Sequence, residues 1–147
     1  MRAVIATFIA VFLALIAFPA HSQSIDQANI DCLARGMYHE ARAESVEGIK
    51  AVGYVILNRT GVAGKFPGNP CGVIYQKGQF VNIRTLPIKD KKTYSKVREI
   101  AEQVYNAPQG DNTNGATYFH NVKVKPHWGK KMIRTAKYGN HIFFKQG

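Results

Sequence analysis

The segment from residue 26 to residue 43 has the spacing of an α-helix that packs one face against a core. With an advance of about 100° per residue, that face collects Ile30, Leu33, Met37 and Ala41. Glu40 falls on the same face. Because an unpaired carboxylate is costly to bury, a glutamate in this position needs either a charged partner or a chemical use. The first helix therefore constrains both the packing of the chain and its candidate chemistry.

Position alone leaves two interpretations of Glu40. In the structural interpretation, Glu40 forms an ion pair with Arg35 or Arg42, which is the commoner use of such a residue. In the functional interpretation, desolvation raises the pKa of the carboxyl group and keeps it protonated. A general acid that works near neutral pH requires that state.

The N-terminal residues have the pattern of a secretory signal peptide. Arg2 precedes an apolar run over residues 3–18, and small and polar residues follow over 19–23. We expect cleavage after Ser22, or alternatively after Ala20, so that residues 1–22 are removed and residues 23–147 form one domain. The apolar run is short for a spanning helix, although an uncleaved anchor is the alternative. We therefore expect a monomer exported to the periplasm or cell envelope, with no stable membrane span.

The chain is strongly basic, with 20 Lys and Arg residues, 9 Asp and Glu residues and a formal net charge of +11. In an exported protein this charge favours anionic polymers such as cell-wall glycans, or membrane surfaces, and we expect no nucleic-acid partner. Plain solubility is an equal alternative. A basic cluster that could contact a substrate consists of Lys123, Lys125, Lys130 and Lys131. Trp128 lies inside it, in an expected loop, where it could stack on a sugar or pack at the rim of the domain.

Cys32 and Cys71 are the only cysteines of the chain. In an exported domain such a pair predicts one disulfide, which would tie the first helix to the loop after the second, with two buried thiols as the alternative. No zinc-type spacing of Cys or His accompanies them, so we expect no metal and no cofactor. Residues 111–115 resemble part of a calcium loop but lack its later glutamate, and we expect a tight turn there.

The remaining pattern predicts an α+β fold, a mainly helical single domain with a small β element. Ser45 can cap a second helix through Asn58, in which Gly53 permits a close helix crossing. A third helix is expected over residues 91–106. β-prone stretches follow at 116–119 and 142–145, and the turn dipeptide Gly139-Asn140 introduces the second.

Several short motifs, in this order and spacing, resemble the SleB-type cell wall hydrolases, which include spore cortex-lytic enzymes and exported proteins of Gram-negative bacteria. They are YHEAR at 38–42, VILNR at 55–59, FP at 66–67, CGVI at 71–74, GQF at 78–80, ATYFH at 116–120, PHW at 126–128 and GNHIF at 139–143. The resemblance covers residues 32–145, nearly the whole mature chain. Two positions depart from it: Val81 replaces a small polar residue, and Phe144 stands where a tyrosine is frequent.

The resemblance implies a lysozyme-like domain that cuts peptidoglycan glycan strands, with Glu40 as the catalytic acid. After Glu40 has given its proton to the leaving oxygen, the reaction can be completed in two ways. A hydrolase needs another carboxylate, for which Glu44 and Glu47 are nearest in sequence and Asp111 is a candidate through folding. A lytic transglycosylase needs none, because the sugar's own 6-hydroxyl attacks. The small number of acids favours the transglycosylase.

Substrate-binding candidates come from the same motifs. Asn58 and Gln79 could hydrogen-bond acetamido groups, or else a helix end and a turn explain them. Alternation along a strand places Tyr118 and His120 on one side, where they could line the groove. The set is completed by Phe80, Trp128 and His141. Two rival functions are a non-enzymatic wall-binding module with a paired Glu40, and a metal-dependent amidase using His120, His127 and His141.

Overall fold

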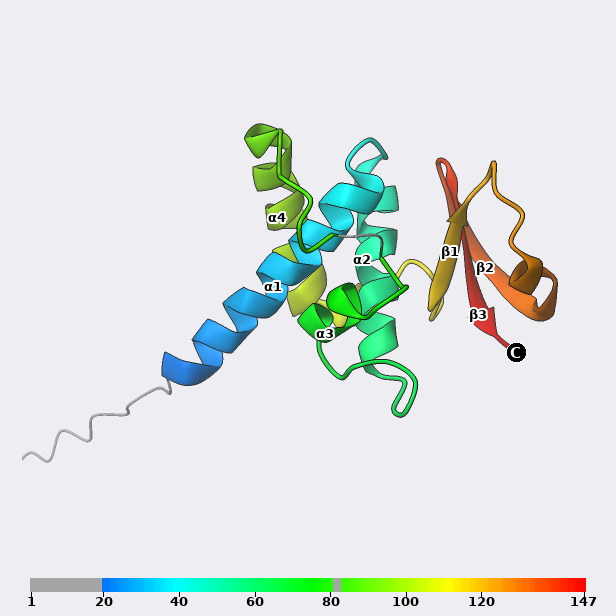
Figure 1. The fold of residues 1–147 in the computed structure, drawn as a ribbon, viewed down its shortest axis with the longest axis horizontal. Coiled ribbons are helices and arrows are strands. Elements are labelled where there is room, and N and C mark those ends of the chain that lie inside the picture. Colours follow the sequence, from blue (N-terminus) through cyan, green and yellow to red (C-terminus); the bar gives the residue numbers. More distant parts are fainter. Residues whose placement is uncertain (1–19, 81–82) are drawn as a thin grey trace, which may run out of the picture.

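Two crossing helices, α1 (Ala20–Ala41) and α2 (Val46–Thr60), form the centre of the protein (Figure 1). The computed structural model describes residues 20–80 and 83–147, with side chains from residue 25 onward. The first helix begins earlier than predicted and includes the last residues of the expected signal peptide. The other residues of that peptide, 1–19, lie outside the described part, as does Val81. No helix in the described part is long and apolar enough to cross a membrane.

Local signals position α2 against α1 as predicted. The Ser45 hydroxyl accepts a hydrogen bond from the backbone N–H of Gly48 at 3.3 Å and caps the helix. A Cβ on Gly53 would lie 2.9 Å from Sδ of Met37, so a larger residue here would force the Met37 side chain to move. The apolar face of α1 is buried at Ile30, Leu33, Met37 and Ala41.

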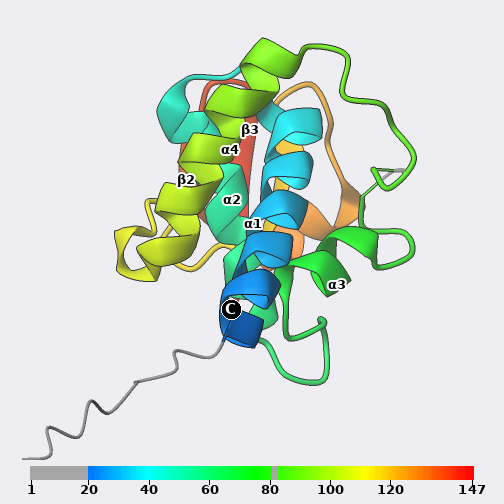
Figure 2. The ribbon, with the colours of Figure 1, turned by 90° about the vertical axis from the view of Figure 1, so that its left-hand side faces the viewer.

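Helices α3 (Pro70–Tyr75) and α4 (Lys91–Asn106) pack on α1, and Figure 2 shows α4 beside it. Helix α4 has the predicted bounds. Asp90 caps it by accepting the Thr93 N–H at 3.0 Å. Its inward face buries Val97, Ala101 and Val104. A short 3-10 helix, η1 (Pro108–Gly110), follows α4.

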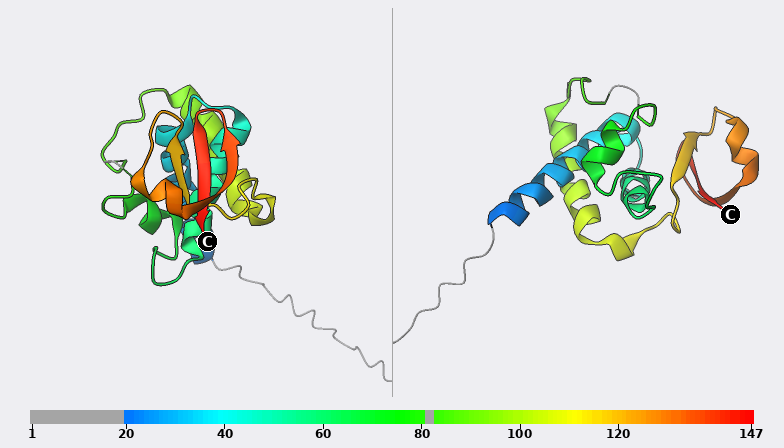
Figure 3. Two further views of the ribbon diagram at one scale, coloured as in Figure 1. Left: turned by 90° about the vertical axis from the view of Figure 1, so that its right-hand side faces the viewer. Right: turned by 60° about the horizontal axis from the view of Figure 1, so that its bottom comes forward.

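Three antiparallel strands form a small sheet in the order β1-β3-β2: β1 (Tyr118–Asn121), β2 (Met132–Tyr138) and β3 (His141–Gln146). A second 3-10 helix, η2 (His127–Lys131), precedes β2. The sheet forms a layer beside α2 (Figure 3). Strand β2 is a correction, since only β1 and β3 were predicted. Its alternation is broken by a register shift between Arg134 and Ala136, and its residues are exposed or only half-buried.

The predicted α+β architecture is confirmed, and its core lies between the helices and one face of the sheet. Phe143 of β3 is fully buried together with Val52, Val55 and Ile56 of α2. Cys71 lies in α3 and not in the loop that was expected after the second helix, and its Sγ atom is bonded to that of Cys32 in α1. The bond joins two helices that also pack directly on each other.

Candidate active site

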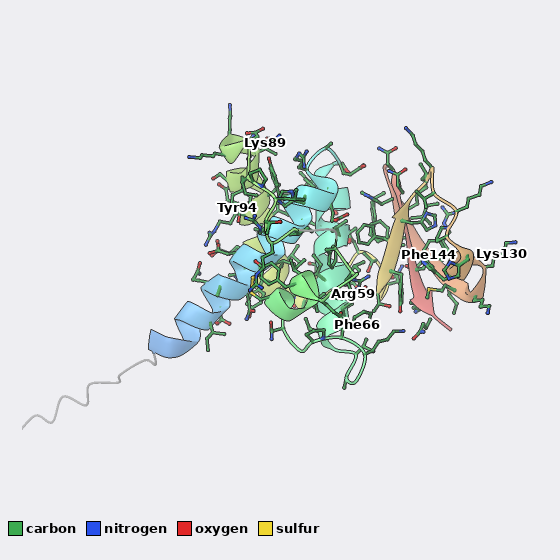
Figure 4. All side chains as sticks on the ribbon, in the orientation of Figure 1. Arg59, Phe66, Lys89, Tyr94, Lys130 and Phe144 are labelled. Carbon is green, nitrogen blue, oxygen red and sulfur yellow. A yellow bond between two sulfur atoms is a disulfide. The ribbon has the colours of Figure 1, made fainter. Side chains whose placement is uncertain are left out.

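Glu40 lies in the last turn of α1, half-buried at the wall of an open pocket of about 420 Å³. We call this the Glu40 pocket; it is lined by Tyr38, His39, Glu40, Arg42, Ile83, Leu86, Pro87 and Lys89. The C-terminal end of α1 forms one wall and the segment before α4 forms the other. Lys89 stands near the start of α4 in Figure 4.

The surroundings of Glu40 favour its neutral form. Burial raises the pKa of its carboxyl group, and the positive charge of Arg59 offsets part of that rise. The C-terminal end of a helix carries partial negative charge, which also disfavours a carboxylate in the last turn. Among the described residues, no side chain forms a hydrogen bond or ion pair with Glu40.

Neither arginine named for the structural interpretation pairs with Glu40. The guanidinium group of Arg35 donates to the backbone carbonyls of Ile83 at 2.7 Å and of Leu86. It therefore holds the segment that forms the second wall of the Glu40 pocket. Arg42 lies over the Tyr38 ring, 5.0 Å from its centroid, and donates to the Tyr38 carbonyl at 3.5 Å.

Arg59, the last residue of the second motif, is the cation whose charge lowers the pKa of Glu40. It is only 5 % exposed, and its Nε donates to the Thr117 carbonyl at 2.8 Å. Burial lowers the pKa of Arg59 to about 10, so the group is still charged at neutral pH. Its guanidinium carbon lies between 5.0 and 5.7 Å from the ring centroids of Phe66, Phe80 and Tyr118. Figure 4 shows Arg59 and Phe66 together at the C-terminal end of α2.

Aromatic side chains continue from Arg59 onto the outer face of the sheet, the face that carries Trp128. The Tyr118 ring contacts both Arg59 and Trp128, and the centroids of the Tyr118 and Trp128 rings are 5.5 Å apart. His120 lies 5.7 Å from Trp128 and 5.1 Å from Phe144 between ring centroids. The folded chain thus brings together three of the predicted substrate-binding residues, Tyr118, His120 and Trp128.

The chain was compared with known proteins once this geometry was defined. The family model described as Cell Wall Hydrolase matches residues 43–144. The chain belongs to the cell wall hydrolase family. The matched range begins three residues after Glu40.

Named relatives of this family member are spore cortex-lytic enzymes. Those of Bacillus subtilis (strain 168) and Halalkalibacterium halodurans are each 34% identical over 120 residues, which is 78% of this chain and 37% and 34% of the relatives. The chain therefore spans little more than a third of their length.

Two solved structures are similar in fold, each with a TM-score of 0.68, 30% identity and coverage of 81% of this chain. One is the catalytic domain of the Bacillus cereus SleB protein, of which 91% is covered. The other is the catalytic domain of the germination-specific lytic transglycosylase SleB from Bacillus anthracis, of which 95% is covered. The predicted lysozyme-like fold is thereby confirmed.

Two other predicted site residues, Asn58 and Gln79, have different surroundings. The Asn58 amide donates to Asp111 and to the Ala116 carbonyl, each at 3.0 Å, so it holds the loop that leads into β1. Gln79 is exposed in a turn, where its backbone N–H donates to Gln76 at 3.2 Å. The turn that was the structural alternative for Gln79 is therefore favoured, whereas Asn58 holds a distant loop and does not cap a helix end.

His141 and Phe80 are both buried but occupy different places. The rings of His141 and Phe119 have centroids 5.2 Å apart. His141 lies on the face of the sheet opposite to Tyr118 and His120. Burial lowers the pKa of His141. Phe80 packs against Arg59. Phe80 therefore belongs to the aromatic group around Arg59, whereas His141 belongs to the interface between the sheet and the helices.

The three carboxylates considered as second catalytic groups all have structural contacts. Glu44 accepts hydrogen bonds from the backbone and side chain of Asn140, at 3.3 and 3.1 Å. Glu47 lies 3.6 Å from Lys50. Asp111 accepts hydrogen bonds in its own turn, which has the tight form predicted for residues 111–115. None of them raises the pKa of Glu40, as a nearby negative charge would.

Two residues of the candidate site, His39 and Arg59, were given no role in the sequence analysis. His39 lines the Glu40 pocket, and burial, with added repulsion from Arg35 and Arg42, lowers its pKa and favours the neutral ring. Arg59 was part of a recognised motif but received no role. An arginine among the apolar residues of a central helix was the signal that could have identified it. Across the described residues, no three His, Cys, Asp or Glu side chains are grouped so as to hold a metal ion.

Proposed function

We propose that this protein cleaves the glycan strands of peptidoglycan, with Glu40 as the general acid. The observation that carries the proposal is a half-buried carboxyl group with a raised pKa and no ion-pair partner at the wall of an open pocket. Membership of the cell wall hydrolase family supports it. So does the similarity to a protein described as a lytic transglycosylase.

In the first step, protonated Glu40 gives its proton to the glycosidic oxygen that leaves the anomeric carbon of muramic acid. The bond between that carbon and oxygen breaks, and positive charge develops on the sugar ring. Glu40 is then a carboxylate, which the positive field of Arg59 stabilises. Arg59 thus prevents the pKa of Glu40 from rising so far that proton transfer becomes unfavourable.

We propose that the second step is intramolecular. The 6-hydroxyl of the same sugar bonds to the anomeric carbon, and its proton returns to the Glu40 carboxylate, so no water is consumed. The structural contacts of Glu44, Glu47 and Asp111 support this form of the reaction. A hydroxyl group held within the bound sugar also has a high effective concentration.

The products are therefore expected to end in 1,6-anhydro-muramic acid. Digestion of purified peptidoglycan followed by mass spectrometry tests this, because anhydro products are lighter than reducing products by one water, about 18 Da. A hydrolytic muramidase acting on the same material supplies the reducing reference. Reducing ends as the main product would show that water is activated and would require tests of Glu44, Glu47 and Asp111.

Replacing Arg59 by methionine is expected to move the alkaline limit of activity to higher pH. The acid must be protonated, so activity falls as the pH rises through the pKa of Glu40. Loss of the positive charge raises that pKa further. The pH dependence of cleavage of isolated cell walls measures the shift.

Arg59→Lys is the matched control, because it loses the same hydrogen bond to Thr117 but keeps a cation. We expect a smaller shift in this variant, and thermal unfolding of both variants checks that they fold. The same pH limit in the wild type and in a folded Arg59→Met protein would contradict the electrostatic role.

We propose that the protein is exported, that residues 1–22 act as the signal peptide, and that the periplasm or cell envelope is its site of action. The apolar run after Arg2 and the bonded Cys32–Cys71 pair support this location, since disulfides persist in oxidising compartments. We further propose Phe80, Tyr118, His120 and Trp128 as contacts for the substrate. The aromatic contacts that join them to Arg59 support that assignment.

A further inference from the structure

A second pocket, of about 640 Å³, lies on the outer face of the sheet. We call it the outer-sheet pocket; it is lined by His120, Lys125, Pro126, His127, Gly129, Lys130 and Phe144. None of these residues lines the Glu40 pocket. Figure 4 shows Lys130 and Phe144 on the sheet side of the molecule, while Lys89 lies on the opposite side.

The outer-sheet pocket lies in a part of the chain that has no negative side chains. Residues 112–147 contain seven Lys and Arg residues and no Asp or Glu. Among the described residues, neither Lys125 nor Lys130 has a carboxylate within 4 Å. Two ammonium groups without acidic partners at one pocket attract an anionic ligand.

The walls of this pocket also have an apolar part. Phe144 and Pro126 supply carbon surface, and the Trp128 ring packs against Phe144 at 5.7 Å between centroids. The suitable ligand therefore combines carboxylate groups with aliphatic segments. In peptidoglycan the peptide stems have this composition, whereas the sugars of the strand are uncharged apart from their substituents.

We propose that the outer-sheet pocket binds the carboxylates of peptidoglycan peptide stems while the glycan strand occupies the Glu40 pocket. This inference rests on the proposed function. A row of contacts leads from Arg59 through Tyr118 and Trp128 to Phe144, which lines the outer-sheet pocket. Arg59 itself acts on Glu40 through its charge. Stem binding would thus anchor the substrate along the aromatic row without taking part in proton transfer.

Binding of a soluble stem tripeptide, measured by NMR titration, tests the proposal without any cleavage. The ligands are the tripeptide with free carboxylates and its fully amidated counterpart. The wild-type protein is expected to bind the free form and not the amidated form. The double variant K125Q/K130Q is expected to bind the free form about fivefold more weakly, the size of two exposed ion pairs.

The matched control is R134Q/K137Q, which removes the same charge from exposed residues of β2 that do not line the pocket. We expect its affinity to equal that of the wild type. Equal losses in both double variants, equal binding of the amidated peptide, or no binding to the wild type would overturn the proposal. Weakened binding to phosphatidylglycerol vesicles, with stem binding unchanged, would instead assign this surface to a membrane and would also overturn it.

Cleavage assays separate this inference from the proposed function. On intact peptidoglycan, K125Q/K130Q is expected to lose activity at low substrate concentration, whereas on glycan strands stripped of their stems it should match the wild type. An equal loss on both substrates would contradict a stem site. If the wild type cleaves neither substrate, the proposed function fails, and the peptide titration still decides whether the stem site exists.

Discussion

Replacing Glu40 by glutamine is expected to lower glycan cleavage by about 10²–10⁴-fold, the usual contribution of a general acid. The amide keeps the shape of the side chain but cannot supply the proton. Loss of turbidity of isolated cell walls measures the activity, and released muropeptides confirm it. Glu44→Gln and Glu47→Gln are matched controls that should retain cleavage, because both carboxylates have structural contacts. Cleavage close to the wild-type rate by Glu40→Gln would eliminate the assignment.

The same variant distinguishes an enzyme from a non-enzymatic wall-binding module. A binding module with an inactive Glu40 would show no cleavage by the wild type either. An active wild type and an inactive, folded Glu40→Gln protein that still binds cell walls would support catalysis. Sedimentation with insoluble peptidoglycan measures the binding of both proteins.

Glu40→Gln should also change how stability depends on pH. Burial raises the pKa of Glu40 in the folded protein above its unfolded value. Between these two pKa values the folded state binds more protons than the unfolded state, so wild-type stability falls as the pH rises through this window. Glutamine does not titrate. The variant should therefore be more stable relative to the wild type at a pH above the folded pKa of Glu40 than at a pH below its unfolded value. Thermal unfolding at both pH values measures this, and an opposite change would contradict the raised pKa.

Removing the bond between Cys32 and Cys71 is expected to lower the free energy of unfolding by about 4 kcal/mol. The two residues are separated by 39 positions, and the crosslink restricts the unfolded chain over that loop. Denaturant unfolding of the Cys32→Ala/Cys71→Ala variant measures the loss. Reduced wild-type protein is the control and should show a similar decrease. A loss below about 1 kcal/mol would show that the bond contributes little.

Alkylation without reductant, followed by intact mass, tests whether the bond is present in the exported protein. The expected result is a mass without added label. Two labelled cysteines in freshly purified periplasmic protein would rule the bond out.

Helices α1, α2 and α4 follow from the sequence because their signals are local, whereas the short helix α3 was not predicted. The apolar face of α1, the Ser45 cap of α2 and both ends of α4 depend on side chains a few residues apart, and each was predicted. Glu40 was identified for the same reason, because a carboxylate on an apolar helix face can be recognised from residues within two turns of the helix. The sequence therefore predicted three of the four α-helices and two of the three strands.

Contacts between distant residues decided the rest. Arg59 acts on Glu40 from another helix, and Asn58 bonds to Asp111 at a separation of 53 residues. Strand β2 exists because it pairs with β3, although its own pattern is irregular. Local spacing contains no information on which carboxylates lie near Glu40 or which lysines share a pocket. Those relations depend on how the helices and the sheet pack, and packing is a property of the whole chain.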